Sequence, residues 1–169
     1  MHKYTPTSTL HSVTGYHVST VPVSKFSVEH INHPDTNLGV HFTTTLGDAR
    51  AFAEFYGYSE YYLYSVNLTN LKMWNVVDVE NWTSIEIVQQ IVNPRSGQFN
   101  FIRNVLANSK YSEETTSQKE LIPMLKNMGI NCLTYVNNVE TSVKCTCLCV
   151  LDDTCMSVPT LIEHRHLES

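Results

Sequence analysis

Hydrophobic and polar residues alternate along several short stretches of this chain, which is the pattern of half-buried β-strands. The clearest case is residues 61–68, where Tyr62, Tyr64 and Val66 would share one face of a strand and the residues between them the other. The same reasoning predicts further strands over 15–20, 39–44, 71–79, 130–136 and 144–152. The predicted strands therefore lie early and late in the chain.

Helical spacing follows the strand at 39–44. Small and aromatic residues recur there at intervals of three and four, namely Ala49, Phe52, Ala53 and Tyr56. Thr45 or Asp48 can cap the start of this helix, and Gly57 can end it. Further helices are predicted over 84–92, 98–107 and 117–128, the last of which contains Pro123.

Helices inserted between early and late strands indicate an α+β fold. The 169 residues fit one domain, 1–169. We expect two small antiparallel sheets with flanking helices. The polar ends, residues 1–13 and 160–169, are expected to be peripheral or flexible.

Composition excludes several classes of protein. Hydrophobic residues make up 42% of the chain and charged residues 16%, which suits a folded core. The net charge is −5 and no lysine–arginine cluster occurs, so nucleic acid is an unlikely partner. The chain shows no charged and apolar leader and no apolar run of membrane-spanning length, so we expect a cytoplasmic protein without a membrane partner.

The five cysteines form an odd number, which argues against a disulfide framework and predicts reduced thiols. Cys145, Cys147 and Cys149 would share one face of a strand. Zinc sites use a turn that brings two thiolates together, so this spacing fits a metal poorly. Small buried hydrophobic side chains explain it better, and we predict no metal site.

Two histidines carry the candidate chemistry. His17 lies in the middle of the strand at 15–20, and its ring offers one donor and one acceptor nitrogen to a sugar hydroxyl. His41 lies on the strand at 39–44, where an imidazole can stack on a flat ring. The alternative for His17 is a half-buried histidine whose hydrogen bonds are made by the backbone.

These histidines lie within motifs that occur in a fixed order. The motifs are Gly15-Tyr16-His17-Val18-Ser19-Thr20, Gly39-Val40-His41-Phe42-Thr43-Thr44, the stretch from Cys132 through Asn137 to Glu140, and Cys149-Val150-Leu151-Asp152. Together with the helix after Thr44, they resemble ADP-ribosyltransferases of the histidine–tyrosine–glutamate type, in the branch of phage and polyvalent proteins. The resemblance spans residues 15–156, most of the chain.

The resemblance implies a split β-sandwich and an enzyme that uses NAD as substrate, releases nicotinamide and transfers ADP-ribose to a target macromolecule. The target would be a protein of unknown identity, and a phage effector or counter-defence protein would act in the host cytoplasm. The implied catalytic residues are Glu140, His17 and His41. The implied NAD-binding residues are His17, Val18, Ser19, Thr20, His41, Thr43 and Tyr56.

Two other functions stay open at this point. His41 stands where the family usually has tyrosine, and Glu140 lies in the turn before the last strand rather than directly before it. These departures favour a non-catalytic binding or inhibitor protein on the same fold. An NAD glycohydrolase, in which water replaces the acceptor, is the other alternative.

Overall fold

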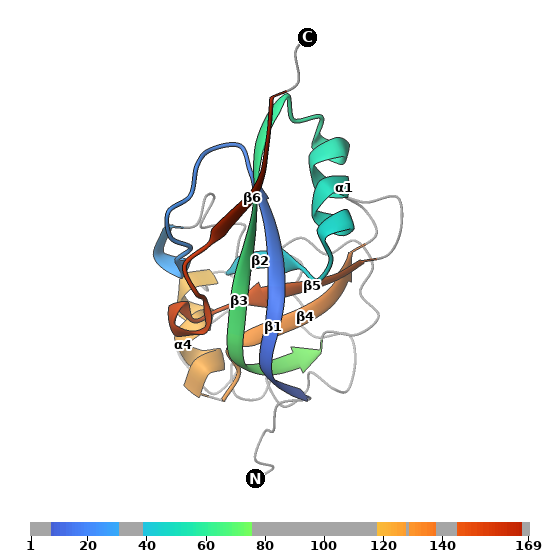
Figure 1. Ribbon diagram of the computed structural model, residues 1–169. Helices are drawn as coiled ribbons and strands as arrows, with labels where there is room; N and C mark the ends of the chain where they lie inside the picture. Colours follow the sequence, from blue (N-terminus) through green and yellow to red (C-terminus); the bar gives the residue numbers. More distant parts are fainter. Residues whose placement is uncertain (1–7, 31–38, 76–117, 128, 138–144, 167–169) are drawn as a thin grey trace.

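A computed structural model describes residues 8–30, 39–75, 118–127, 129–137 and 145–166 (Figure 1). The described residues form six strands and two α-helices, so the expected α+β class is confirmed. In chain order the elements are β1 (Ser8–Ser19), the 3₁₀ helix η1 (Val28–His30), β2 (Val40–Thr43), α1 (Leu46–Tyr56), β3 (Glu60–Asn75), α4 (Gln118–Asn127), β4 (Cys132–Asn137), β5 (Cys145–Val150), the 3₁₀ helix η3 (Asp153–Cys155) and β6 (Thr160–His166). The helices predicted over 84–92 and 98–107 lie outside the described residues.

The six strands form one mixed sheet in the order β1-β2-β5-β4-β3-β6, and β1 also pairs with β3. Two antiparallel groups can be distinguished within it, β6-β3-β1 and β2-β5-β4. In Figure 1, β1 and β3 cross β2, β5 and β4 at a steep angle. The groups join at two narrow seams, a single β1–β2 residue pair and three parallel β3–β4 pairs. Two separate antiparallel sheets were expected instead; β3, with 16 residues, is long enough to pair with β1 and then reach β4.

Both ends of the chain enter the sheet further than the sequence predicted. Strand β1 begins at Ser8, which pairs with Met73 of β3, and β6 pairs with the start of β3. Residues 8–13 and 160–166 therefore belong to strands of the sheet. The hydrophobic pattern did not predict these strand residues because many of their side chains are polar. Strand pairing uses backbone groups, so side chains such as those of His11 and Ser12 can stay exposed.

The predicted strands at 61–68 and 71–79 are parts of the single strand β3. Asn70 interrupts its pairing with β1, and this residue has a φ angle of 55° in the left-handed region. The side-chain amide of Asn131 compensates for the irregularity. It donates to the carbonyl oxygen of Asn70 at 2.9 Å and accepts from the backbone N–H of Lys72 at 2.7 Å.

Helix α1 has the predicted caps. The hydroxyl group of Thr45 accepts a hydrogen bond from the backbone N–H of Asp48, and Gly57 ends the helix with a φ angle of 64°. Ala49 and Ala53 are buried against the sheet. Helix α4 contains the expected Pro123. Neither helix that the structure describes is long and apolar enough to cross a membrane.

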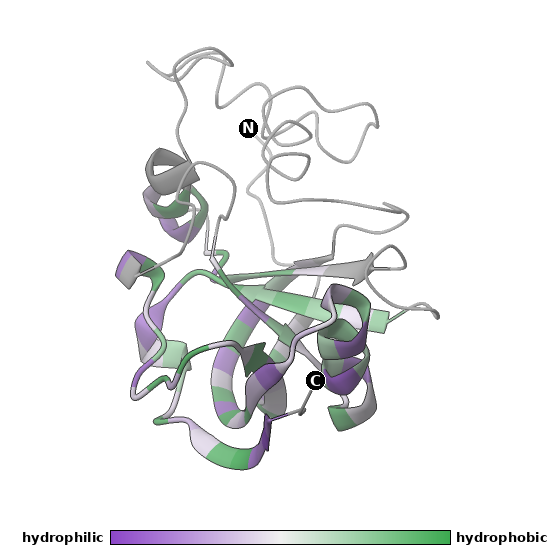
Figure 2. Cartoon of the chain, turned by 90° about the horizontal axis from the view of Figure 1, so that it is seen from above, coloured by the Kyte–Doolittle hydropathy of each residue, from purple (hydrophilic) through white to green (hydrophobic). Residues whose placement is uncertain are grey.

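The main core contains residues from both antiparallel groups. Figure 2 shows hydrophobic stretches along the strands in the middle of the molecule, whereas α1 carries both hydrophobic and hydrophilic residues. The alternation predicted for β3 is confirmed, since Tyr64 and Val66 enter the main core and Leu63 packs with α1. The buried members of this core are Phe26, Val40, Phe42, Tyr64, Val66, Leu68, Leu71, Met73, Cys132, Leu148, Val150 and Cys155.

Candidate functional site

The side chain of His17 connects β1 to β2. Its Nδ1 atom lies 2.6 Å from the backbone carbonyl oxygen of His41. Because a carbonyl oxygen only accepts, Nδ1 must carry the proton. In the neutral ring the lone pair is then on Nε2, and no hydrogen-bond partner of Nε2 lies among the described residues. Within the described part of the chain, the ring therefore has one nitrogen fixed by a hydrogen bond and one acceptor nitrogen without a hydrogen-bond partner, Nε2.

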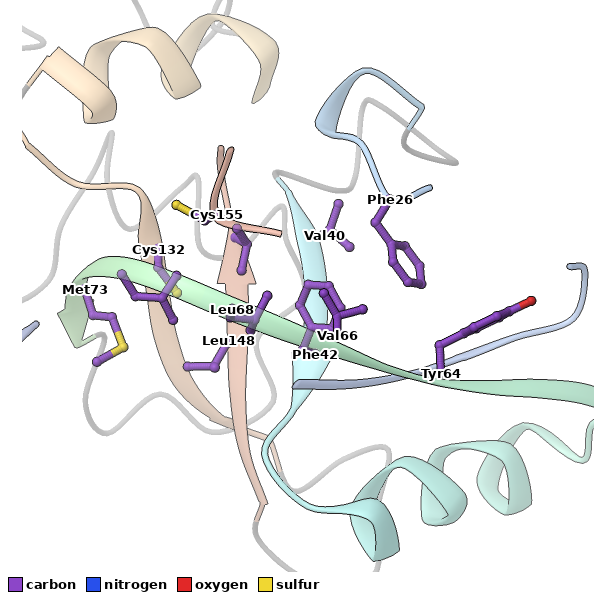
Figure 3. Close-up of a cluster of buried hydrophobic side chains, with 12 residues drawn as sticks. Phe26, Val40, Phe42, Tyr64, Val66, Leu68, Met73, Cys132, Leu148 and Cys155 are labelled. Carbon is purple, nitrogen blue, oxygen red and sulfur yellow. The ribbon is translucent and has the colours of Figure 1, made fainter. Parts of the chain in front are cut away.

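Aromatic rings surround the imidazole of His17. The ring centroids of Phe26 and Phe42 lie 4.8 and 5.9 Å from that of His17, both in edge-to-face geometry. Phe26 also meets Phe42 at 5.5 Å and Tyr64 at 5.9 Å. Figure 3 shows Phe26, Phe42 and Tyr64 together at one end of the main core, with Met73 and Cys132 at the other. The imidazole is thus held by one hydrogen bond and two ring contacts.

Both histidines are uncharged near neutral pH. Burial lowers the pKa of His17 below its ordinary value of 6.5, and the hydrogen bond to His41 opposes this shift without cancelling it. Burial, followed by the charge of a protonated His17, lowers the pKa of His41 to about 4. A neutral His17 keeps its acceptor nitrogen at physiological pH.

The two imidazole side chains do not share one face of the sheet. Tyr16 pairs with Thr43, so His17 lies on the same face as Phe42, where their rings meet. Successive side chains of a strand alternate between faces, so the side chain of His41 projects from the opposite face to Phe42. The two imidazole rings therefore lie on opposite faces of the sheet, and His41 contacts the His17 ring through its backbone carbonyl.

The other predicted NAD-binding residues of β1 lie around His17. Val18 points to the opposite face and packs in the cluster that includes α1. The hydroxyl group of Ser19 accepts a hydrogen bond from the backbone N–H of Val21 at 3.2 Å and so shapes the turn after β1. Thr20 is exposed in that turn. Ser19 and Thr20 thus lie at the turn that follows β1, while Val18 has a packing role.

The remaining two predicted NAD-binding residues differ in position. Thr43 is buried at the β1–β2 seam, and its hydroxyl group donates to the carbonyl oxygen of Thr45 at 2.8 Å. Tyr56 lies at the end of α1 with 51% of its surface exposed, and it stacks on Tyr58 at 5.5 Å. Thr43 thus belongs to the seam that contains His17, whereas Tyr56 belongs to an aromatic pair at the helix end.

The predicted catalytic acid, Glu140, lies outside the described residues. The residues that flank its segment are described, and Asn137 pairs with Cys145 at the end of the β4–β5 ladder. Two residues along β5, Cys147 pairs with Thr43. The segment containing Glu140 therefore starts and ends at the end of the sheet where β2 meets β1.

All five cysteines are buried, as predicted for small hydrophobic side chains, and none of them forms a disulfide bond. The sulfur atoms of Cys145 and Cys147 lie 3.7 Å apart on β5. Within the described part of the chain, no group of three or more histidine, cysteine, aspartate or glutamate side chains could hold a metal ion.

Sequence reasoning missed Phe26 and Asp153. Asp153 starts η3, and its carboxylate accepts hydrogen bonds from the Ser27 hydroxyl at 2.6 Å and the Val28 N–H at 2.8 Å. These contacts fix the chain at the start of η1, directly after Phe26, whose ring meets that of His17. The sequence shows only two successive aspartates after a strand, and no local pattern could name partners 125 and 126 residues away.

The chain was also compared with known proteins. No protein family, curated protein or solved structure matches it.

Proposed function

We propose that this protein is an NAD-consuming ADP-ribosyltransferase. It would bind NAD beside the β1–β2 seam, release nicotinamide and transfer ADP-ribose to a macromolecular target. The resemblance of its motifs to the histidine–tyrosine–glutamate type supports this proposal. So does the packing of two antiparallel strand groups over one core, which suits an ADP-ribosyltransferase-like split β-sandwich.

The observation that carries the proposal is the state of His17. The hydrogen bond to the His41 carbonyl fixes the ring and its tautomer, and burial keeps it neutral. A fixed acceptor nitrogen with no partner among the described residues suits a donor from a ligand, and a ribose hydroxyl is such a donor. His41 then serves the site through its backbone, as a positioning residue.

The proposed reaction breaks the bond between nicotinamide and C1 of its ribose. The electron pair of that bond leaves with nicotinamide, which departs neutral, and the sugar develops positive charge as in glycoside hydrolysis. Glu140 would stabilise that charge and hydrogen-bond the 2′-hydroxyl group. The acceptor forms the new bond to C1 and loses its proton to a base or to solvent.

Release of nicotinamide from NAD tests this proposal. Wild type should release nicotinamide, and H17N and E140Q should each reduce the rate by at least about 100-fold, because they remove a ligand contact and a stabilising carboxylate. H11N is the matched control, since His11 lies exposed on the same strand and should retain the wild-type rate. Labelled ADP-ribose on a macromolecule identifies a transferase, and free ADP-ribose alone identifies an NAD glycohydrolase.

One observation favours a second candidate, a non-catalytic NAD-binding protein. The side chain of His41 projects from the face opposite to His17, so it cannot stack on the same ligand ring as a family tyrosine would. Saturable NAD binding that H17A abolishes, without nicotinamide release in the presence of candidate acceptors, would support this function. Absence of both binding and release would overturn both proposals.

A further inference from the structure

We propose that Asp153 and Tyr64 are positioning residues for His17, acting through the connecting segment between β1 and η1 (residues 20–27). Neither residue hydrogen-bonds to the imidazole. Both hold the connecting segment, and that segment places Phe26 against the His17 ring. The consequence for NAD binding rests on the proposed function, whereas the positioning itself does not.

Asp153 anchors the end of the connecting segment. Its two carboxylate oxygens accept from two different donors, the hydroxyl group of Ser27 and the backbone N–H of Val28. The same hydroxyl group accepts from the backbone N–H of Glu29 at 3.2 Å. Hydrogen bonds to a carboxylate are stronger than those between neutral groups. Ser27 is buried, with 7% of its surface exposed, so this anchor is shielded from water.

Tyr64 anchors the other side of the same segment. Its hydroxyl oxygen accepts a hydrogen bond from the backbone N–H of Val23 at 2.7 Å, although the two residues are 41 positions apart. Tyr64 is also the residue of β3 that pairs with His17 of β1. The backbone pairing of β1 with β3 therefore fixes the position of Tyr64 relative to His17.

Phe26 lies between these two anchors and transmits their effect. It follows Val23 by three positions and immediately precedes Ser27, so both anchors restrict its position. Its ring contacts His17, Phe42 and Tyr64, and only 8% of the surface of Phe26 is exposed. Phe42, which lies on β2, also contacts the imidazole, so the rings of Phe26 and Phe42 both restrict the orientation of His17. Loss of Phe26 from this place would free the ring to rotate away from the His41 carbonyl.

Nuclear magnetic resonance of the histidine ring nitrogens tests the proposal on the intact chain without any ligand. Wild type should show His17 as a single tautomer protonated at Nδ1. In D153N the side-chain amide of asparagine has one acceptor oxygen in place of the two carboxylate oxygens of Asp153. The His17 ring nitrogens should therefore give broadened or mixed-tautomer signals. Exchange of the Val28 amide hydrogen should accelerate at least about tenfold. S24A, an exposed substitution in the same segment, should leave both signals unchanged.

Two further variants keep the test decisive if D153N lowers the stability of the whole chain. S27A removes one donor to the carboxylate, and F26L keeps an apolar side chain but removes the ring. Both should broaden the His17 signal while that of the distant His164 stays sharp. A His17 signal identical to wild type in all three variants, with faster exchange at Val28 in D153N, would overturn the proposal.

Titration with NAD separates this proposal from the proposed function. If wild type binds NAD, D153N should weaken binding about tenfold and F26L by a similar factor, while S24A binds as wild type does. If wild type does not bind NAD, the proposed function fails. The nitrogen signals of His17 then still decide whether Asp153 positions the ring.

Discussion

Arg50 of α1 and Glu163 of β6 form an ion pair across 113 positions of the chain, with Nη2 and Oε2 2.9 Å apart. The same carboxylate accepts a hydrogen bond from the hydroxyl group of Tyr61 at 3.0 Å and pairs with Arg165 at 2.9 Å. Three elements of the fold, α1, β3 and β6, therefore meet at one carboxylate. This contact secures the terminal strand, which packs few apolar side chains.

The first prediction concerns this carboxylate and pH. Burial by itself would raise the pKa of Glu163, but hydrogen bonds from Arg50 and Tyr61 and the nearby positive charges outweigh it and hold the pKa below 4.5. The stabilisation is therefore present above pH 4.5 and is lost as the pH falls through the lower folded-state value. E163Q should reduce the free energy of unfolding by about 1 kcal/mol near pH 7, measured by urea denaturation.

The difference between E163Q and wild type should shrink below pH 4.5, where the wild-type carboxylate also becomes neutral. E29Q is the control, since Glu29 is exposed. An E163Q effect that persists undiminished at low pH would show that shape rather than charge matters at this position.

The second prediction concerns His41. The unfolded ring binds a proton below pH 6.5, whereas the folded ring stays neutral down to about pH 4. Acidification through this window therefore favours the unfolded state, and the free energy of unfolding should fall by up to about 3 kcal/mol because of this residue. Urea denaturation of H41N should show a shallower fall between pH 6.5 and 4 than wild type. Equal slopes in H41N and wild type would contradict a buried neutral imidazole at this position.

The third prediction compares two glycines of α1. An added Cβ atom meets nothing within 4 Å at Gly47 or Gly57, but Gly57 has a φ angle of 64°. G47A should raise the free energy of unfolding by up to about 1 kcal/mol, because alanine favours the helix and restricts the unfolded chain. G57A should lower it by about 1 kcal/mol, because alanine is strained in the left-handed region. Thermal unfolding of the two variants should therefore move the midpoint in opposite directions, and a shift of the same sign would contradict the assigned helix end.

The fourth prediction concerns thiol reactivity. Burial raises the pKa of Cys149 to about 12, and it also raises the pKa of Cys132 and Cys155. Protonated, buried thiols react slowly, so an aromatic disulfide reagent near pH 8 should modify the native protein at least about 100-fold more slowly than free cysteine. All five cysteines should react in concentrated guanidinium chloride. Rapid modification of a thiol in the native protein would show that the core opens around that residue.

Features set by nearby residues were predictable from the sequence. Thr45 and Gly57 bound α1 because caps depend on a few neighbouring backbone groups. The two faces of β3 followed from alternation. Features set by distant partners were not predictable. The start of β1 at Ser8 depends on pairing with Met73, and the fixing of Phe26 depends on Asp153 and Tyr64.

In the candidate site, too, features set by nearby residues were predictable and features set by distant partners were not. The position of His17 on a strand and the order of the motifs could be read from the sequence, together with the alternative that the backbone satisfies its ring. The face onto which each histidine projects depends on the pairing of Tyr16 with Thr43, which no local pattern specifies. The structure shows the backbone part of that alternative, since the carbonyl oxygen of His41 accepts from one ring nitrogen of His17. The contact of the other nitrogen with a ligand stays a prediction.

The hydrogen bond of His17 also has a structural role, because the β1–β2 seam is narrow. One backbone pair and one imidazole bridge the two antiparallel groups at this place, so the donor lies on one group and the acceptor on the other. A single side chain thus supplements the backbone where the backbone alone provides only one residue pair between β1 and β2.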